Sequence, residues 1–289
     1  MIFRTRFAPS PTGKLHIGHA YSALFGEALS KRNSGEFYLR IDNLDYSRSK
    51  KKFENQIFTD LRWLDIEWNR NIIYQSQRSH IYAKKLKILW DLDLLYDCSC
   101  SRKDIKNALT APHNDDPKLG PDGYVYPGTC RSKRAKGCFD SINNYVLRLD
   151  MAKAWDYLGC NYLIFLESQK FFPEKNKKQI VTREDAINNI GDVVLSRSNL
   201  TASYHLSVVI DDAAQNINNV TRGEDLFEAT KIHTILYALF SLPCPIYHHH
   251  KLITDSKGKR LAKRNDAKSI SYLRGTGMTK QNLLSLINL

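Results

Sequence analysis

A chain of 289 residues, of which 42% are hydrophobic and 25% charged, has an ordinary globular composition and enough length for more than one domain. No apolar run approaches the roughly 20 residues that span a bilayer, and the N-terminus does not fit a signal peptide, so we expect a cytoplasmic protein with no membrane partner. The net charge of +13, with basic runs at 48–52, 131–136, 175–178 and 257–264, favours a nucleic-acid partner over merely solvated faces.

The first hundred residues alternate between strand and helix patterns. Residues 3–8 read as a short buried strand, and a helical pattern follows from about 19 to 32. A second strand pattern covers 36–42, and amphipathic helix patterns cover 53–64 and 80–95. This alternation is typical of an α/β fold, in which a parallel sheet carries helices on its faces.

A different kind of segment begins after residue 95. Residues 96–140 hold four cysteines and a loop rich in Pro, Gly and Asp, which predicts an inserted subdomain. Three strands, a helix and a tail with a further strand, a basic loop and a short helix are expected beyond it. The strands are predicted at 145–150, 193–197 and 204–210, the helix at 224–240, and the tail from 247 onward.

The stretch "SPTGKLHIGHA", residues 10–20, places two histidines where a helix begins after a Pro- and Gly-rich turn. Backbone N–H groups and the helix dipole at such a point suit phosphate. His16 and His19 could donate hydrogen bonds to a nucleotide triphosphate and stabilise charge on a leaving pyrophosphate. The alternative is a helix cap with two surface histidines, since a bare HxGH pattern also occurs by chance.

The wider context favours the nucleotide site. "RFAPSPTGKLHIGHA", "YLRIDNLDYSR", "LRWLDIEW", "YQSQR", "YHLSVVIDD" and "VTRGEDL" follow one another in the order found in class I glutamyl-tRNA synthetases. The chain resembles the catalytic half of that family from residue 4 to about 265. The resemblance implies a Rossmann-like catalytic domain in which His16, Gly18 and His19 bind ATP, with His16 and His19 also catalytic.

The same resemblance implies a second ATP element, a KMSKS-type loop, for which 260–264 ("RLAKR") is the candidate. Lys263 keeps the second lysine of the family pattern and is predicted to be a catalytic, ATP-binding cation. Arg260 and Ala262 depart from the usual lysine and serine. The alternative is a basic loop that only faces RNA.

A glutamate pocket is also implied by the resemblance. Glutamate needs a cation for its side-chain carboxylate and an anion or acceptors for its ammonium group. An arginine considered alone is more often part of a structural ion pair, but here two fall in matched motifs. Asp42 stands where the family has a longer acidic residue, so its contact with the ammonium group would need water or rearrangement. The implied contacts come from Arg6, Phe7, Ala8, Pro9, Ser10, Asp42, Tyr204 and Arg222.

The cysteine-rich segment is a candidate zinc site. Cys98 and Cys100 are followed by Cys130, and three thiolates in two short clusters can begin a tetrahedral site. Some members of the resembling family have Cys-x-Cys and Tyr-x-x-x-Cys elements, which implies Tyr126 as the fourth ligand. Cys138 or water is a rival to Tyr126, and reduced cysteines without metal are the alternative to any site. The zinc would be structural.

Only 25 residues follow Arg264 in the chain of 289, so we expect no anticodon-binding domain. The expected organisation is a divided catalytic domain (1–95 and 191–245), an inserted acceptor-type subdomain (96–190), and a KMSKS-type loop with a C-terminal helical region (246–289).

The short length resembles paralogues within the family that transfer glutamate to queuosine at the wobble position of tRNA(Asp). We therefore expect an ATP-dependent ligase, acting as a monomer, that takes L-glutamate, ATP with Mg²⁺, and queuosine-bearing tRNA(Asp). The alternatives are a truncated ordinary glutamyl-tRNA synthetase and a catalytically silent RNA-binding paralogue.

Overall fold

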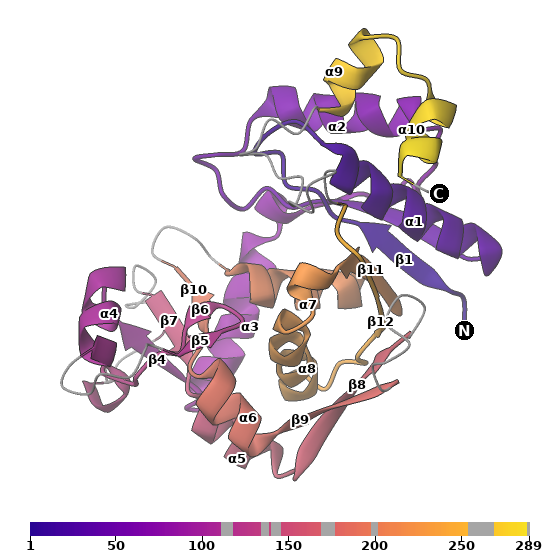
Figure 1. Cartoon of the computed structure of the whole chain (residues 1–289). Coiled ribbons are helices and arrows are strands. Elements are labelled where there is room, and N and C mark those ends of the chain that lie inside the picture. Colours follow the sequence, from indigo (N-terminus) through magenta and orange to yellow (C-terminus); the bar gives the residue numbers. More distant parts are fainter. Residues whose placement is uncertain are drawn as a thin grey trace.

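Parallel strands form the centre of the computed structural model, which describes residues 1–110, 118–133, 139, 146–168, 177–197, 202–253 and 269–287 (Figure 1). One parallel group has the order β1-β2-β3, and a second has the order β11-β12-β8, with β9 antiparallel to β8. The Asn218 N–H donates to the Arg4 carbonyl at 3.2 Å and so ties the two groups together beside β1. These strands are β1 (Arg4–Phe7), β2 (Glu36–Ile41), β3 (Ile73–Tyr74), β8 (Tyr162–Glu167), β9 (Lys178–Thr182), β11 (Asn219–Gly223) and β12 (Ile246–His250).

Each face of the parallel strands has its own hydrophobic core. In β2, Phe37, Leu39 and Ile41 pack into one cluster with α1 (Ile17–Arg32) and α2 (Lys51–Trp63). Tyr38 points the other way, into the cluster of α3 (Ser79–Asp91), α7 (Tyr204–Ala214) and α8 (Ala229–Leu239). The alternation follows from the two-residue period of a strand, and it confirms the α/β prediction.

Helix α1 lies unusually close to β11. A Cβ atom at Gly26 would stand 2.8 Å from the Thr221 hydroxyl oxygen, closer than real Cβ contacts allow. Glycine is therefore tolerated inside this helix because the close approach requires it. The approach brings the N-terminus of α1 and the end of β11 to the same edge of the sheet.

The segment after residue 95 forms a small antiparallel unit to one side of the parallel strands (Figure 1). Its sheet has the order β10-β7-β4, and a two-stranded β5-β6 hairpin lies beside it. These elements are β4 (Leu95–Cys98), α4 (Arg102–Thr110), β5 (Leu119–Gly120), β6 (Gly123–Tyr124), β7 (Val146–Leu149) and β10 (Val194–Ser196). The chain then crosses through α5 (Met151–Leu158) to β8, and β9 leads into the short α6 (Arg183–Asp185).

The prediction of a strand at 204–210 is wrong, because this segment is the first part of α7. The Ser203 hydroxyl caps the helix by accepting from the Leu206 N–H. All residues from 205 to 212 are buried, the polar ones included, so apolar residues do not mark one face and periodicity alone cannot assign the segment to helix or strand.

Two predicted helices are also shorter than expected. Helix α3 ends at Asp91, because Asp93 adopts a left-handed φ of 63° and starts the turn into β4. The segment predicted as a helix at 224–240 begins with a 3₁₀ turn, Glu224–Leu226, and α8 starts only at Ala229.

The C-terminal helices complete the core on the α1 and α2 side. Leu273 of α9 (Ile270–Gly275) and Leu283 of α10 (Lys280–Leu286) are buried in that cluster. Arg274 of α9 also reaches Asp60 of α2 at 3.3 Å. In the part of the chain that the structure describes, no helix has the length and apolar character needed to cross a bilayer.

Candidate active site

A cavity of about 690 Å³ opens at the carboxyl ends of β1, β2 and β11. Ligands of open α/β sheets bind at this edge. Every candidate residue for glutamate or ATP within the described residues lines it: Arg6, Phe7, Ala8, Pro9, Ser10, His16, Gly18, His19, Asp42, Tyr204 and Arg222. Lys263 and its neighbours in 254–268 lie outside the described residues.

His16 and His19 both cap α1 and line the cavity. His16 is the N-cap residue, and its Nδ1 accepts from the Gly18 N–H at 3.1 Å. The Nδ1 of His19 accepts from the His16 N–H at 3.2 Å. Because both Nδ1 atoms act as acceptors, the ring protons reside on Nε2, where they can be donated to a ligand. The helix-cap alternative and the nucleotide-site prediction are therefore compatible.

Gly18 allows the His16 ring to fold over the start of the helix. A Cβ atom at this position would lie 3.1 Å from the His16 ring, which is tighter than most Cβ contacts. The two imidazole rings lie with centroids 3.8 Å apart. A larger residue at position 18 would therefore require the His16 ring to shift at the mouth of the cavity.

Four charged side chains form a largely buried cluster beneath the cavity. Arg6 donates from Nε and Nη2 to the two carboxylate oxygens of Asp212 at 2.8 and 3.2 Å, and from Nη1 to the Thr221 carbonyl. Arg40 contacts Asp212 at 2.5 Å and also holds Asp42, with 2.7 Å between Nε and Oδ1. Burial works to raise the pKa of Asp212, but the two guanidinium groups outweigh it and lower that pKa.

Asp42 behaves differently within the same cluster. Burial raises its pKa, and the attraction of Arg40 does not fully offset this. Its side chain is already held by Arg40, so an ammonium group reaching Asp42 would share it with that arginine. Arg6 uses three of its five N–H donors within the described residues, which leaves donors for a substrate carboxylate.

Arg222 has a different environment, because its partners in the described residues are neutral. Nε donates to Nε2 of His249 at 3.1 Å, and Nη1 contacts Nδ1 of His233 at 3.1 Å. Nη2 donates to the Thr230 hydroxyl and the Leu226 carbonyl. No carboxylate of the described residues pairs directly with this buried guanidinium, so it keeps its positive charge for the cavity.

The two histidines beside that guanidinium have fixed tautomers. Nδ1 of His249 lies 2.6 Å from the Glu167 carboxylate, which accepts a hydrogen bond from it. Nε2 of His233 lies 3.1 Å from Nδ1 of His205, and Nε2 of His205 lies 3.4 Å from Asp122 in the β5-β6 turn. This series of hydrogen-bonded side chains connects the parallel sheet to the antiparallel unit. It leaves Nε2 of His249 and Nδ1 of His233 as acceptors for Arg222.

The stability of the protein is expected to fall as the pH drops below about 6.5, partly because of His233. Burial, followed by the charge of Arg222, lowers the pKa of His233 well below its usual value. Below about pH 6.5 the unfolded chain binds a proton that the folded chain does not, which costs up to about 1.4 kcal/mol of stability per pH unit.

Urea unfolding of wild type and His233→Asn at pH 7.5 and 5.5 measures this effect. The asparagine oxygen can still accept from Arg222 but does not titrate, so the variant should lose less stability between the two pH values. His250, whose pKa burial also lowers, contributes equally to both proteins. Parallel losses in the two proteins would mean that His233 has an ordinary pKa.

Several cavity-lining residues lie outside the predicted set, including Ser22, Arg40, Gln75, Ser207 and His250. Arg40 stands inside the quoted motif "YLRIDN", so its position was visible although its role was not. Asp212 and its neighbour Asp211 end the motif "YHLSVVIDD" as an acidic pair in an apolar run. A buried acidic pair of this kind signals cationic partners.

The neighbouring Asp211 serves the fold. Its carboxylate accepts from Arg78 Nε and the Tyr82 hydroxyl at 2.7 Å and from Gln75 Nε2 at 3.0 Å. These contacts join α7 to α3 and to the turn before it. Since α7 also carries Asp212 and Tyr204, they hold it against the cavity.

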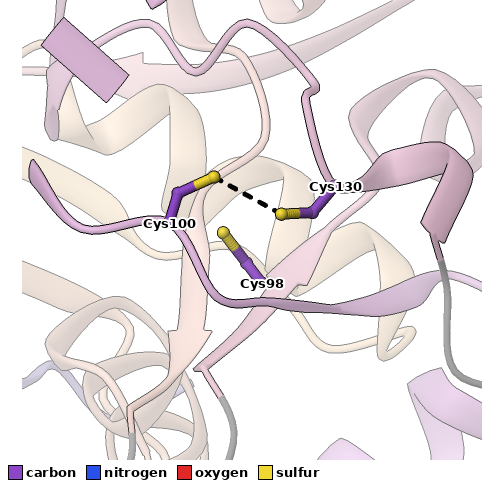
Figure 2. A group of neighbouring side chains, drawn as sticks. All are labelled: Cys98, Cys100 and Cys130. Atoms are coloured by element: carbon purple, nitrogen blue, oxygen red, sulfur yellow. Dashed lines mark hydrogen bonds between the residues drawn. The ribbon is translucent and has the colours of Figure 1, made fainter. Parts of the chain in front are cut away.

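The predicted metal ligands come together away from this cavity. Figure 2 shows Cys98, Cys100 and Cys130 converging, and their sulfur atoms lie within 4.8 Å of one another. The Tyr126 hydroxyl is 3.4 Å from the Cys98 sulfur and 3.3 Å from the Cys100 sulfur. A tetrahedral zinc with metal–sulfur bonds of about 2.3 Å places its sulfurs roughly 4 Å apart, so the four groups fit such a site.

The protonation of the thiols is consistent with metal binding. Burial opposes ionisation of Cys130, but hydrogen bonds, led by that of the Tyr126 hydroxyl, lower its pKa to about 6. Burial raises the pKa of Cys100 to about 11, so this thiol would ionise only with a cation present. Cys138, the rival fourth ligand, lies outside the described residues.

Residues 2–289 match the family described as "tRNA synthetases class I (E and Q), catalytic domain". The chain belongs to this family, and it is an enzyme of the ligase class. Among curated relatives it is similar to the glutamyl-Q tRNA(Asp) synthetase of Rhodobacter capsulatus, with 46% identity over 99% of each chain. The protein of the same name from Rhodopirellula baltica is 32% identical over 96% of this chain and 82% of its own length.

The fold is shared with solved structures of longer enzymes. The glutamate-tRNA synthetase of Elizabethkingia anophelis superposes with a TM-score of 0.69 at 24% identity, over 91% of this chain. The chain spans about half of that structure, 53% of its length. This likeness supports the α/β catalytic-domain fold.

Proposed function

We propose that this enzyme activates L-glutamate with ATP, without tRNA, and then transfers the glutamyl group to queuosine at the wobble position of tRNA(Asp). The names of relatives that the chain matches over most of their length support the acceptor. The observation that carries glutamate activation is Arg222, a buried cation that lines the cavity and has no direct carboxylate partner among the described residues. A substrate with a side-chain carboxylate would supply the missing anion.

Activation forms a bond between an oxygen of the substrate's α-carboxylate and the α-phosphorus of ATP, and pyrophosphate leaves with the electrons of the broken bond. The Nε2 protons of His16 and His19 are placed to stabilise charge on the phosphates. Mg²⁺ would accompany ATP, and Lys263, outside the described residues, would act as a catalytic cation toward the phosphates. In the second step queuosine takes the glutamyl group and AMP is released, so no Ser or Cys nucleophile is required.

Two assays test the proposal. The protein should catalyse glutamate-dependent exchange between ATP and pyrophosphate with no RNA present. Labelled glutamate should then appear on tRNA(Asp) that carries queuosine, but not on an unmodified transcript or on tRNA(Glu). Charging of tRNA(Glu) would replace the proposal with an ordinary glutamyl-tRNA synthetase, and absence of exchange would indicate an RNA-binding paralogue.

We also propose that Cys98, Cys100, Cys130 and Tyr126 hold a structural zinc ion. The metal would join the end of β4 to the 126–130 segment, and none of these ligands lines the glutamate cavity. Tyr126 already accepts from the Cys130 N–H at 3.0 Å, which sets its hydroxyl among the sulfurs.

Removing one thiol should therefore remove the metal. Cys100→Ser is expected to reduce zinc content from about one ion per chain to nearly none, to lower Tm, and to leave exchange activity largely intact. Zinc analysis and thermal unfolding measure these effects, with Cys244→Ser as the control because Cys244 lies outside the group. Zinc retained by Cys100→Ser, or absent from wild type, would refute the site.

A further inference from the structure

A second cavity, of about 570 Å³, lies between the antiparallel sheet and the cysteine group. Its walls include Arg102, Tyr124, Arg148 and Arg197. Arg197 also lines the glutamate cavity, so the two cavities adjoin at this residue. A molecule bound in the second cavity would therefore lie next to the reaction site.

Arg148 is a buried cation at the back of this cavity. Only 9% of the residue is exposed, yet its Nε has no hydrogen-bond partner among the described residues. Nη1 donates to the Asp192 carbonyl at 2.7 Å, and the guanidinium lies 3.9 Å over the Tyr126 ring. The nearby Asp192 carboxylate is paired instead with Arg131, at 2.7 Å.

A buried guanidinium without a carboxylate partner indicates a site for an anion, because desolvation of an uncompensated charge is costly. Within the described residues, neither Arg102 nor Arg197 is ion-paired with a carboxylate, and Arg197 is exposed. Asp122, the acidic residue on the opposite wall, lies 3.4 Å from His205. The cavity therefore has three arginines and two acidic residues. Each acidic residue already has a partner outside the three arginines: Asp192 pairs with Arg131, and Asp122 lies beside His205.

An aromatic ring accompanies these cations. Tyr124 of β6 is 42% exposed and lines the same cavity. Guanidinium groups that bind phosphate, together with an open aromatic face on which a base can stack, are the elements that hold single-stranded RNA. A free inorganic anion would use the arginines but not the ring.

We infer that the second cavity binds a nucleotide of the RNA substrate adjacent to the one that receives glutamate. Its phosphate lies against Arg148, Arg102 and Arg197, and its base lies on Tyr124. The inference rests on the proposed function in taking an RNA as the acceptor. It adds a contact that the activation of glutamate does not need.

Binding and exchange assays on Arg148→Gln, Arg102→Ala and Tyr124→Ala test the inference. The probe is queuosine-bearing tRNA(Asp), bound over a series of salt concentrations. Each variant should weaken binding about tenfold, and the two arginine variants should also flatten the salt dependence by about one unit of log–log slope. Tyr124→Ala should leave that slope unchanged, because a stacking contact releases no counterion.

Exchange without RNA should stay within about twofold of wild type in all three variants, since these residues do not line the glutamate cavity. Arg62→Ala, at an exposed arginine of α2, is the control and should bind normally. If Arg148→Gln fails to fold, the two exposed-site variants, Arg102→Ala and Tyr124→Ala, decide the matter. The inference would be overturned if Tyr124→Ala bound tRNA as tightly as wild type and inorganic phosphate displaced tRNA equally from both proteins. The cavity would then be a phosphate site only.

The outcomes separate this inference from the proposed function. Wild type that glutamylates queuosine, with all three variants binding and acting as wild type, would remove the nucleotide site and keep the function. Wild type that charges a different tRNA, with the variants defective in binding that tRNA, would remove the proposed acceptor and keep the nucleotide site.

Discussion

Replacing Asp212 with asparagine is expected to lower the free energy of unfolding by about 3–5 kcal/mol. The Asp212 carboxylate is shared by Arg6 and Arg40, whose side chains are only 6% and 0% exposed. Asparagine has nearly the same size but no charge, so both guanidinium groups would remain buried with Asp42 as the only acid in the cluster. Equilibrium unfolding in urea measures the loss.

Asp91→Asn is the matched control. This carboxylate is 56% exposed and pairs with Lys87 at 2.8 Å on the surface of α3. Such exposed pairs contribute about 0.3–0.5 kcal/mol, so the control should change little. Equal losses in Asp212→Asn and Asp91→Asn would show that the buried cluster contributes no more than a surface pair.

His16→Asn and His19→Asn are each expected to lower the rate constant of glutamate-dependent exchange by about 10²–10³-fold, while glutamate affinity changes little. An asparagine oxygen can replace the histidine Nδ1 as the acceptor that caps α1, and asparagine is a strong N-cap residue. It cannot replace the Nε2 donor. These substitutions therefore separate the structural role of each ring from its role toward phosphate.

Three measurements are needed for this prediction: the exchange rate constant, glutamate binding by calorimetry, and Tm. His80→Asn, at an exposed histidine of α3, is the control and should affect none of them. A loss of exchange that is matched by a loss of Tm or of glutamate affinity would mean that His16 and His19 are structural only.

The residues of the cavity could be predicted because they fall in motifs that follow one another in the order found in a known family. Each predicted residue lies at the end of a parallel strand or at the start of a helix, where the fold class itself places ligands. The cysteine group could be predicted because Cys98 and Cys100 are close in sequence and Cys130, 30 positions after Cys100, falls in a matching family element. Helix α7 could not, because a segment buried on all sides shows neither period.

The distribution of charge in the cavity was also beyond prediction. The matched motifs gave Arg6 and Arg222 the same implied role, yet Arg6 is neutralised by Asp212 and Arg222 is surrounded by histidines. No sequence motif predicted the second cavity. It depends on Arg148 and Arg197, which lie in separate strands or strand ends and meet only when β7 and β10 pair.

Local pattern and motif order therefore suffice for the α/β class, for the residues that gather at one edge of the sheet, and for the thiol group. The fold class follows from the spacing of apolar residues along the chain, and the site residues and the thiol group follow from motifs that resemble those of a known family. Tertiary structure decided which arginine is paired with a buried carboxylate, Arg6 with Asp212, and which has only neutral partners among the described residues, Arg222. Arg6 and Asp212 are 206 positions apart, and the strength of a buried ion pair depends on distance and desolvation, which exist only after the chain has folded.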